Sequence, residues 1–594
     1  MTDVTVDAGA RDNGASHQGG GDPAGVAQSP QLEEAAKTSS WNSIARLLRT
    51  ARHLRARQAL FWAIRRGWGR SFRIPAQAAM QIRSGVQMRA ELASSASGLA
   101  ENEFEFLNVR RRFDNGIDWR SADHSRLWQY NLHYFDYALD PGRPPDWIRA
   151  TMQDWVKRNP PGKSVGWEPY PVSLRIANWI KFDLRPGHPG QLPPPCRRSL
   201  CQQLWWLERN LEHEIQANHL LKNAKALFFG GAYFSGKAAD RWLRKGRKLF
   251  LEQVEEQIRP DGGHYERSAM YHAIVLEDML DVLSLSVGSA GLMSANDIAS
   301  LVRHAGNALS YLENLTFPAG RLPMFNDSVA GIAPDTASLR SYAHAILPFP
   351  DPYIPSDAAL INKPDTGFFG YRHDAEMLLV DGGAPSPSYQ PGHSHCGLLG
   401  FELVVAGRPV IVNSGVYDYE TTPLRRLLRS TAAHNTVRID CDEQSEIWGA
   451  FRMGRRARPG RISLSADLPD RFRFAGSHDG YRGRAGRPIH RRAIECRIGH
   501  CWHVADDIIG RGSHLVESFL HFHPSFRLEM EGDGWIAVCQ DSELRFRITA
   551  TGGAATREPS TYCPRFGVRH CNWMLVLRSE AVLPARLTYT IEKL

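Results

Sequence analysis

Two stretches with helical periodicity carry side chains that can move protons or bind an anion. Asn218 and His219 are adjacent in "EIQANHLLKNAKALFF", and Tyr265 and Tyr271 lie in "DGGHYERSAMYH". A neutral imidazole is a competent base near pH 7, and a phenol with a pKa of about 10 is suited to donating a proton. Each residue also has a structural explanation, because a tyrosine is often a core aromatic and an asparagine often satisfies a backbone group.

Two further stretches carry histidines beside strand-like segments. His393 and His395 are one residue apart in "PGHSHCGLLGFEL", and His434 comes just before a strand-like run in "STAAHNTVRID". A single histidine is more often structural than catalytic, so the argument for a site rests on all four stretches together. Such a site would lie between the helical and the strand-like parts of the chain, a common position for a substrate cleft.

The elements that must position these residues change type along the chain. Amphipathic runs of helix length, separated by Gly and Pro, fill most of residues 41–350 and predict a toroid or solenoid of α-hairpins. Over residues 365–594, short segments with period-two patterning alternate with turns and predict an antiparallel β-sandwich. The predicted fold class is therefore α+β, with helices first and sheets second.

The N-terminal part has a different composition. Residues 1–40 are rich in Gly, Ala, Ser and Asp and predict a disordered tail. Over residues 41–71, apolar residues at helical spacing alternate with arginines, which predicts a basic amphipathic helix. Such a helix either packs on the next domain with its arginines in solvent or lies on an anionic membrane surface, and we favour the first interpretation.

Composition limits the partners and the compartment. The chain of 594 residues has a formal net charge of +9, which attracts acidic polysaccharide, anionic membrane or nucleic acid. Nucleic acid ranks last, because no DNA- or RNA-binding signature is present. The nine cysteines include no CxxC pair, which argues against a disulfide scaffold and a cysteine zinc site. We see no signal peptide and no transmembrane segment, so we expect a cytoplasmic protein, or a periplasmic one if the start site is misassigned.

Several long motifs resemble the heparinase II/III-like polysaccharide lyases. In chain order they are "YNLHYFDYA", "WEPYPVSLRIANWIK", "ANHLLKNAKAL", "GGHYERSAMYH", "PGHSHCGLLGFEL", "VNSGVYDY" and "STAAHNTVRID". Long matches in the same order are far more specific than one HxH pair. The resemblance implies an N-terminal α/α toroid, an incomplete barrel, followed by an antiparallel β-sandwich, which agrees with the periodicity.

The resemblance also implies a reaction, the β-elimination of a uronic acid from an acidic polysaccharide or oligosaccharide. The C5 proton of a uronate is weakly acidic, because its removal adds negative charge to an anion, so the carboxylate must be neutralised first. By resemblance Asn218, with His219, takes that role. Tyr271 and His393 remove the C5 proton and protonate the departing O4, in an order that depends on the stereochemistry of the sugar.

By resemblance, the second histidine of the HxH pair, an Asp and the later histidine bind a metal, usually zinc. These positions are His395, Asn413 and His434 here. Asn413 departs from the pattern, and an amide oxygen is a weaker zinc ligand than a carboxylate. The site therefore holds a structural zinc, with Asp418 as a substitute ligand, or is metal-free and held by hydrogen bonds. A second departure is Gly397, where relatives have an acidic residue that could orient an imidazole.

We predict Tyr265, Arg425 and Arg429 as substrate-binding residues. The arginines precede His434 and could contact carboxylates or sulfates, although a solvated loop is the alternative. Glu266 is either a helix charge or the partner of an arginine. Four aromatic residues at helical spacing are better explained as core residues than as platforms for sugar rings: Trp167, Tyr170, Trp205 and Trp206.

Two other functions stay open. A uronyl C5-epimerase uses the same carboxylate neutralisation and two acid/base groups. A non-catalytic polysaccharide-binding or exopolysaccharide-assembly protein would keep the fold without the chemistry, and the departures at Asn413 and Gly397 favour it. The leading hypothesis is a lyase.

Overall fold

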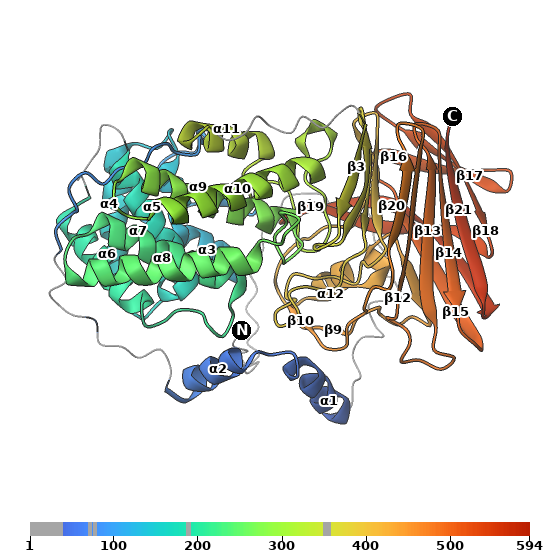
Figure 1. Cartoon of the computed structure of the whole chain (residues 1–594), viewed down its shortest axis with the longest axis horizontal. Coiled ribbons are helices and arrows are strands. Elements are labelled where there is room, and N and C mark those ends of the chain that lie inside the picture. Colours follow the sequence, from blue (N-terminus) through green and yellow to red (C-terminus); the bar gives the residue numbers. More distant parts are fainter. Residues whose placement is uncertain (1–39, 69–73, 75–79, 186–191, 349–357) are drawn as a thin grey trace. The chain divides into compact units, whose positions relative to one another are not determined.

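The computed structural model describes residues 40–68, 74, 80–185, 192–348 and 358–594 (Figure 1). Apart from Ser40, the predicted disordered tail over residues 1–40 lies outside the described residues. The single helix predicted over 41–71 is wrong, because the structure has α1 (Ser40–Ala51) and α2 (Ala56–Trp68) there. The Arg55 backbone N–H donates to Oε1 of Gln58 at 3.0 Å, so a glutamine side chain caps the start of α2. Residues 69–71 of that prediction lie outside the described residues.

Helices make up most of the described chain between Arg126 and Ile346, after a hairpin of β1 (Glu103–Phe106) and β2 (Val109–Arg112) that we did not predict. The helices are α3 (Arg126–Tyr134), α4 (Pro145–Arg158), α5 (Pro169–Leu184), α6 (Pro194–Leu207), α7 (Ala217–Tyr233), α8 (Lys237–Gln257), α9 (Ala269–Gly288), α10 (Ala295–Leu315) and α11 (Thr336–Ile346). The packed pairs include α7 on α8, α5 on α7 and α9 on α10 (Figure 1).

Glycines let α7 and α8 approach closely. A Cβ atom on Gly231 would lie 2.2 Å from the backbone nitrogen of Leu243, and one on Gly246 would lie 2.4 Å from that of Phe228. The core of the helical part is rich in aromatic side chains, and it includes Trp167 and Trp206, which are both buried as we expected. The close packing of α7 on α8 fixes the position of α7, whose first turn carries Asn218 and His219.

Strands make up most of the chain from Ala358 onward, so the sheet part begins before residue 365. A five-stranded sheet has the order β3-β4-β5-β6-β7, and its strands are β3 (Ala358–Lys363), β4 (Phe368–His373), β5 (Glu376–Asp381), β6 (Phe401–Val405) and β7 (Arg408–Ile411). A four-stranded sheet has the order β19-β20-β15-β8, and its strands are β8 (Val437–Ile439), β15 (Ser513–His521), β19 (Ala554–Arg565) and β20 (Val568–Val582). Between β7 and β8 lies the short helix α12 (Pro423–Arg429).

An eight-stranded sheet has the order β11-β12-β13-β14-β21-β18-β17-β16. Its strands are β11 (Ser463–Asp467), β12 (Arg471–His478), β13 (Ile489–Arg497), β14 (Cys501–Ile509), β16 (Phe526–Glu531), β17 (Gly534–Cys539), β18 (Arg545–Thr551) and β21 (Ala585–Lys593), and a separate hairpin pairs β9 (Ile447–Trp448) with β10 (Arg452–Met453). One core holds Leu403, Leu575 and Trp502, which come from the three different sheets. The sheets therefore pack on each other as in a β-sandwich. None of the described helices is long and apolar enough to cross a membrane.

Candidate active site

One buried carboxylate joins the helical part to the sheet part. Asp327, in the loop before α11, accepts hydrogen bonds from His393 Nδ1 at 2.9 Å and His395 Nε2 at 2.8 Å. It also accepts two from Arg425, from Nη1 at 2.5 Å and Nη2 at 2.8 Å. Burial alone would raise the pKa of Asp327, but Arg425 and the two histidines outweigh it and hold that pKa well below its usual range. Asp327 is therefore ionised, and it fixes side chains from the β5–β6 loop and from α12.

His393 is oriented as a base. Because its Nδ1 donates to Asp327, Nε2 carries the lone pair and can accept a proton. Its ring stacks on that of Tyr271, with centroids 4.0 Å apart and the planes tilted by 33°. The His393 side chain is 14% exposed, so solvent or a ligand can reach it.

Tyr271 is oriented and protonated by its surroundings. Ser268, the N-cap of α9, accepts a hydrogen bond from the Tyr271 backbone N–H at 3.2 Å and donates to the backbone oxygen of Asp327 at 2.6 Å. The Tyr271 hydroxyl lies 3.3 Å from that of Tyr419. Burial, followed by Tyr419, raises the pKa of Tyr271 well above 10, so the side chain is a proton donor at neutral pH.

Asn218 lies on the first turn of α7, after two residues with positive φ, Gln216 at 65° and Ala217 at 53°. Such backbone strain clusters at functional sites. Asn218 Nδ2 is 3.1 Å from each carboxylate oxygen of Glu266, and its buried Oδ1 has no hydrogen-bond partner among the described residues. Glu266 Oε2 is in turn 4.0 Å from His393 Nε2. Glu266 is therefore the partner of Asn218, whereas we had expected a helix charge or a partner of an arginine.

His219 is held by two neighbours. Its Nδ1 lies 3.0 Å from Oε1 of Glu212, and its ring packs on Tyr170 with centroids 4.4 Å apart. A carboxylate accepts only, so Nδ1 carries the proton and Nε2 is left with a lone pair. The His219 side chain is 28% exposed, and Tyr170 is half-buried beside it rather than enclosed in the core.

The predicted metal ligands do not form the expected set. His434 Nδ1 donates to Asn413 Oδ1 at 2.9 Å, so Asn413 faces the nitrogen of His434 that bears the proton. The other nitrogen, His434 Nε2, and Nδ1 of His395 are both buried without a partner among the described residues, and the two rings lie 5.3 Å apart. Two imidazole nitrogens are fewer than the three or four protein ligands of a zinc site. This donor set does not fit zinc, and the described ranges hold no cluster of three or more His, Cys, Asp or Glu side chains around a common point.

Two neighbours of these histidines explain why Asn413 and Gly397 occur here. Asn413 Nδ2 donates to Oε1 of Glu402 at 3.0 Å, a hydrogen bond that an aspartate could not make. A Cβ atom on Gly397 would lie 3.1 Å from Cγ of His434, so a larger residue would displace that ring. The orienting role that we expected of an acidic residue at 397 belongs to Asp327.

The three predicted substrate-binding residues are all buried. Arg425 and Arg429 are 1% and 0% exposed, and Arg429 donates to the backbone oxygens of Gly449 and Ser394 at 3.2 and 3.1 Å. The Tyr265 hydroxyl lies 2.9 Å from that of Tyr389. Arg425 and Arg429 thus hold the loop that carries His393, because their guanidinium groups bind acceptors inside the protein. Their burial does not support our prediction that these three side chains contact substrate directly.

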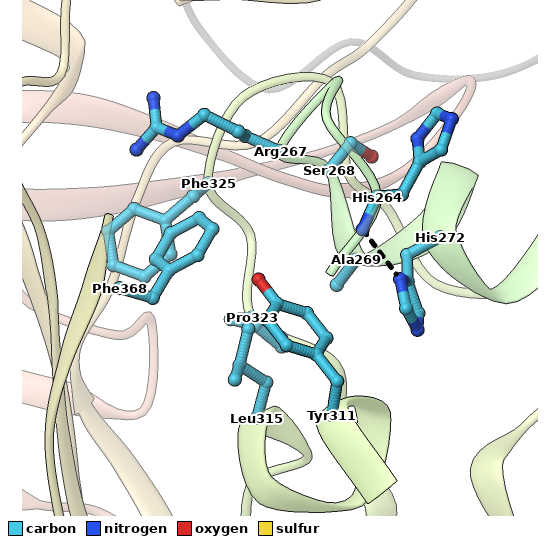
Figure 2. Close-up of a pocket in the computed structure, with 10 residues that line it drawn as sticks. All are labelled: His264, Arg267, Ser268, Ala269, His272, Tyr311, Leu315, Pro323, Phe325 and Phe368. Carbon is cyan, nitrogen blue, oxygen red and sulfur yellow. Dashed lines mark hydrogen bonds between the residues drawn. The ribbon is translucent and has the colours of Figure 1, made fainter. Parts of the chain in front are cut away.

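A small cavity lies beside the segment that carries Glu266 and Tyr271, and residues 264 and 267–269 of that segment line it (Figure 2). The His264 backbone N–H donates to Nδ1 of His272 at 3.1 Å, and His272 Nε2 lies 2.8 Å from the backbone oxygen of Ala308. Burial lowers the pKa of His272 to about 4, so it is neutral. The cavity has room for about one water molecule, which is too little for a sugar. These histidines are structural.

Sequence reasoning missed Asp327, Glu266 as the partner of Asn218, and Tyr419. Asp327 lies in "MFNDSV", a loop without the periodicity of a helix or strand. Its preceding residue, Asn326, has a φ of 58° and donates to the backbone oxygen of Arg267 at 2.8 Å. The available signal for Asp327 was the pair of polar residues that follows Met324 and Phe325 in this turn. Tyr419 lies in "VNSGVYDY", one of the motifs that carry the family resemblance.

Two family models together match most of the chain. The family model described as "Heparinase II/III N-terminus" matches residues 33–353, and the one described as "Heparinase II/III-like, C-terminal" matches residues 356–588. A heparin-sulfate lyase from Pedobacter heparinus is 24% identical over 360 residues, covering 55% of this chain and 52% of the relative. A heparin-sulfate lyase from Bacteroides stercoris is 23% identical over 390 residues, covering 55% of this chain and 56% of the relative. The chain thus spans about half the length of these curated relatives.

Solved structures agree on the fold. A crystal structure of heparinase III has a TM-score of 0.65 at 19% identity and covers 81% of this chain and 80% of its own. A mutant of the heparan sulfate lyase HepC from Pedobacter heparinus has a TM-score of 0.57 at 17% identity, covering 83% and 81%. These likenesses confirm the predicted fold class, an α/α toroid followed by an antiparallel β-sandwich.

Proposed function

Because the chain belongs to the heparinase II/III-like family, we propose that it is a polysaccharide lyase that cleaves a uronate-containing polysaccharide by β-elimination. The observation that carries this proposal is the stacked pair of His393 and Tyr271, whose ring centroids are 4.0 Å apart. Asp327 leaves His393 with a free lone pair, and burial keeps the proton on Tyr271. The relatives named heparin-sulfate lyase make heparan sulfate and heparin the first substrates to test.

In the proposed reaction, His393 Nε2 removes the C5 proton of the uronate and becomes an imidazolium stabilised by Asp327. The electron pair forms the C4–C5 double bond as the C4–O4 bond breaks. Tyr271 gives its proton to the departing O4. The proton on His393 then returns to Tyr271, directly or through water, and this restores both groups.

Neutralisation of the substrate carboxylate is assigned to Asn218 and His219. The Asn218 amide has two diverging N–H donors, and the two carboxylate oxygens of Glu266, each 3.1 Å from Nδ2, share one of them. We propose that the substrate carboxylate takes one of them, while Glu266 keeps the other and holds the amide in place. The substrate carboxylate would favour the imidazolium form of His219, in which Nε2 as well as Nδ1 is a donor, and the His219 ring packs on Tyr170.

The stacking also bears on stereochemistry. Two groups that stack at 4.0 Å approach a sugar ring from the same face, because no ring fits between them. In glucuronate the C5 hydrogen and O4 lie on the same face of the ring, whereas in iduronate they lie on opposite faces. This supports elimination at glucuronate. It argues against the epimerase alternative, in which one group removes the proton from one face and the other returns a proton to the opposite face.

An ultraviolet absorbance assay for the conjugated double bond tests the proposal. Purified protein is mixed with heparan sulfate, hyaluronan, dermatan sulfate, alginate and glucuronan. We expect absorbance to rise with the glucuronate polymers and to rise much less with iduronate-rich dermatan sulfate. Tyr271→Phe should abolish the rise, while Tyr589→Phe, a matched loss of a buried hydroxyl that donates to the backbone oxygen of Ser518 in the sheet part, should leave it. Solvent deuterium at C5 of uncleaved chains, without absorbance, would contradict elimination and indicate an epimerase.

A further inference from the structure

Helix α1 packs on the sheet part through its polar face. Arg49 donates to both carboxylate oxygens of Glu446, from Nε at 2.8 Å and Nη2 at 2.5 Å. Arg46 lies over the ring of Trp448, 5.1 Å from its centroid, and the Trp448 indole N–H donates to Oγ1 of Thr50 at 3.1 Å. Residues 46, 49 and 50 share one side of a helix, because they are three and four positions apart. An amphipathic helix ordinarily turns its apolar side inward, and α1 does the reverse.

The opposite side of α1 is apolar and exposed. Leu47 and Leu48 are exposed, and so are Leu54 in the turn and Leu60 and Trp62 on α2. Half of the large hydrophobic residues that are exposed in the described chain lie between residues 44 and 62. Clustering of this kind marks an interaction surface, whereas single exposed apolar residues need no explanation.

Helix α2 also packs through polar groups. Arg65 donates from Nη1 to Oδ1 of Asn210 at 2.6 Å and from Nη2 to the backbone oxygen of Leu211 at 2.9 Å. Gln58 is buried on the same side and donates to the backbone oxygen of Glu214 at 3.4 Å. On α2, Phe61 packs its ring on that of His213 with centroids 4.6 Å apart, whereas Leu60 and Trp62 stay exposed on different sides of the helix.

The border of this apolar side is strongly basic. Residues 45–68 contain seven arginines and no Asp or Glu. Arg52, Arg57 and Arg66 are exposed and form no ion pair with any described residue. Arg456 of the sheet part adds a cation near His53, whose pKa is lowered by burial first and then by Arg456. Arg49, Arg55 and Arg65 pair with Glu446, Glu256 and Glu214, and the remaining arginines leave a net positive charge beside the exposed leucines.

We propose that the exposed apolar side chains between Leu47 and Trp62 and the arginines that border them form a docking surface for an anionic lipid bilayer. Leucine and tryptophan side chains enter the boundary between headgroups and acyl chains, and arginines at the edge contact lipid phosphates. Five exposed apolar side chains do not favour a polysaccharide as the partner of this surface. A second copy docked through the same surface would place arginines against arginines, which costs free energy.

Co-sedimentation of the full chain with vesicles tests this surface. Phosphatidylcholine vesicles are compared with vesicles that also contain phosphatidylglycerol. We expect binding to the anionic vesicles, weakened by salt, and little binding to the neutral ones. Leu47→Glu with Leu48→Glu should weaken binding at least tenfold. Met530→Glu is the matched control, because Met530 and Leu48 are both 67% exposed and Met530 lies on β16. Each of Arg52→Gln and Arg66→Gln should weaken binding about fivefold.

Three results would overturn the proposal. One is the absence of binding to anionic vesicles, or binding that the leucine and arginine variants leave unchanged. Another is a change of oligomeric state in the leucine variant without lipid, measured by analytical ultracentrifugation, which would make the surface a contact between copies. The third is a loss of heparan sulfate binding in the arginine variants with lipid binding intact, which would assign the surface to polysaccharide.

Discussion

The surroundings of Asp327 and those of His434, which both lie beside His395, differ in how well their buried polar atoms are paired. Around Asp327, both carboxylate oxygens accept two hydrogen bonds each, from His393, His395 and Arg425. Around His434, the neutral amide of Asn413 pairs with one ring nitrogen, and the other has no partner among the described residues. A charged acceptor makes stronger hydrogen bonds than a neutral amide oxygen does. We therefore expect Asp327 to fix the proposed catalytic geometry and the His395–His434 contact to be the more adaptable region.

The largest effect is expected from Asp327→Asn. It removes the only carboxylate that pairs with buried Arg425 in the described structure and frees His393, so the free energy of unfolding should fall by about 3–5 kcal/mol. The lyase rate should fall at least about a hundredfold, as for loss of a positioned base. Denaturant unfolding and the absorbance assay measure the two effects.

Asp507→Asn is the control for that variant, because Asp507 forms an exposed ion pair with Arg586 and its loss should cost less than about 1 kcal/mol. Equal effects of the two substitutions would show that Asp327 has no special role.

Acidification should affect stability through His395. Burial, despite Asp327, lowers the pKa of His395 to about 4, while an unfolded histidine titrates near 6.5. Between these values the unfolded chain binds the extra proton, so stability is lost as the pH falls from about 6.5 to 4. A shift of this size corresponds to roughly 3 kcal/mol.

The test compares urea unfolding of the wild type and His395→Gln at neutral and at acidic pH. Glutamine keeps an N–H donor for Asp327 but does not titrate, so the variant should lose less stability on acidification. Parallel pH dependence in the two proteins would mean that His395 titrates alike in the folded and unfolded chains.

Asn413→Asp sharpens the comparison from the other side. The new carboxylate would lie about 3.0 Å from that of Glu402, so we expect a loss of about 1–3 kcal/mol without metal. The new carboxylate would face Nδ1 of His434, which carries the proton, and not the unpartnered Nε2, so it would add no zinc ligand on the side where His395 and His434 have free nitrogens. Added zinc should therefore leave the melting temperatures of both proteins unchanged. Stoichiometric zinc in the purified wild type would contradict our conclusion that its donor set does not fit this metal.

Gly397→Ala should have the smallest effect. The added Cβ atom would approach Cγ of His434 to 3.1 Å and Nδ1 to 3.3 Å, which requires a small displacement of the ring. We expect a loss of about 1 kcal/mol in thermal unfolding and little change in lyase rate, because His393 is held by Asp327. A large loss of activity would mean that the His434 region takes part in catalysis.

The sequence predicted those features that depend on local patterns. Helical periodicity identified the segments that form α5 and α8 to α10 but merged those of α6 and α7 into one run, and period-two patterning identified the sheets. The resemblance selected Asn218, Tyr271 and His393, and the structure brings His393 against Tyr271 and within reach of Glu266, which binds Asn218.

Features that depend on tertiary contacts were not predictable in the same way. Asp327 lies in a loop, and its importance comes from partners about 66 to 98 residues away in the chain. Arg425 and Arg429 read as surface charges because most arginines are exposed, and only the fold shows that they are buried. The break between α1 and α2 was missed because Gln58, which caps α2, also fits inside a helix.

Mass spectrometry of heparan sulfate digests tests the central claim most directly. Elimination gives oligosaccharides whose new non-reducing ends are lighter by one water than hydrolysis products, because the C4–C5 double bond replaces the added water. We predict these unsaturated products with the wild type and Tyr589→Phe, none with Tyr271→Phe, and at least about a hundredfold less with Asp327→Asn. Saturated products, or unsaturated products that persist in Tyr271→Phe, would contradict elimination by His393 and Tyr271.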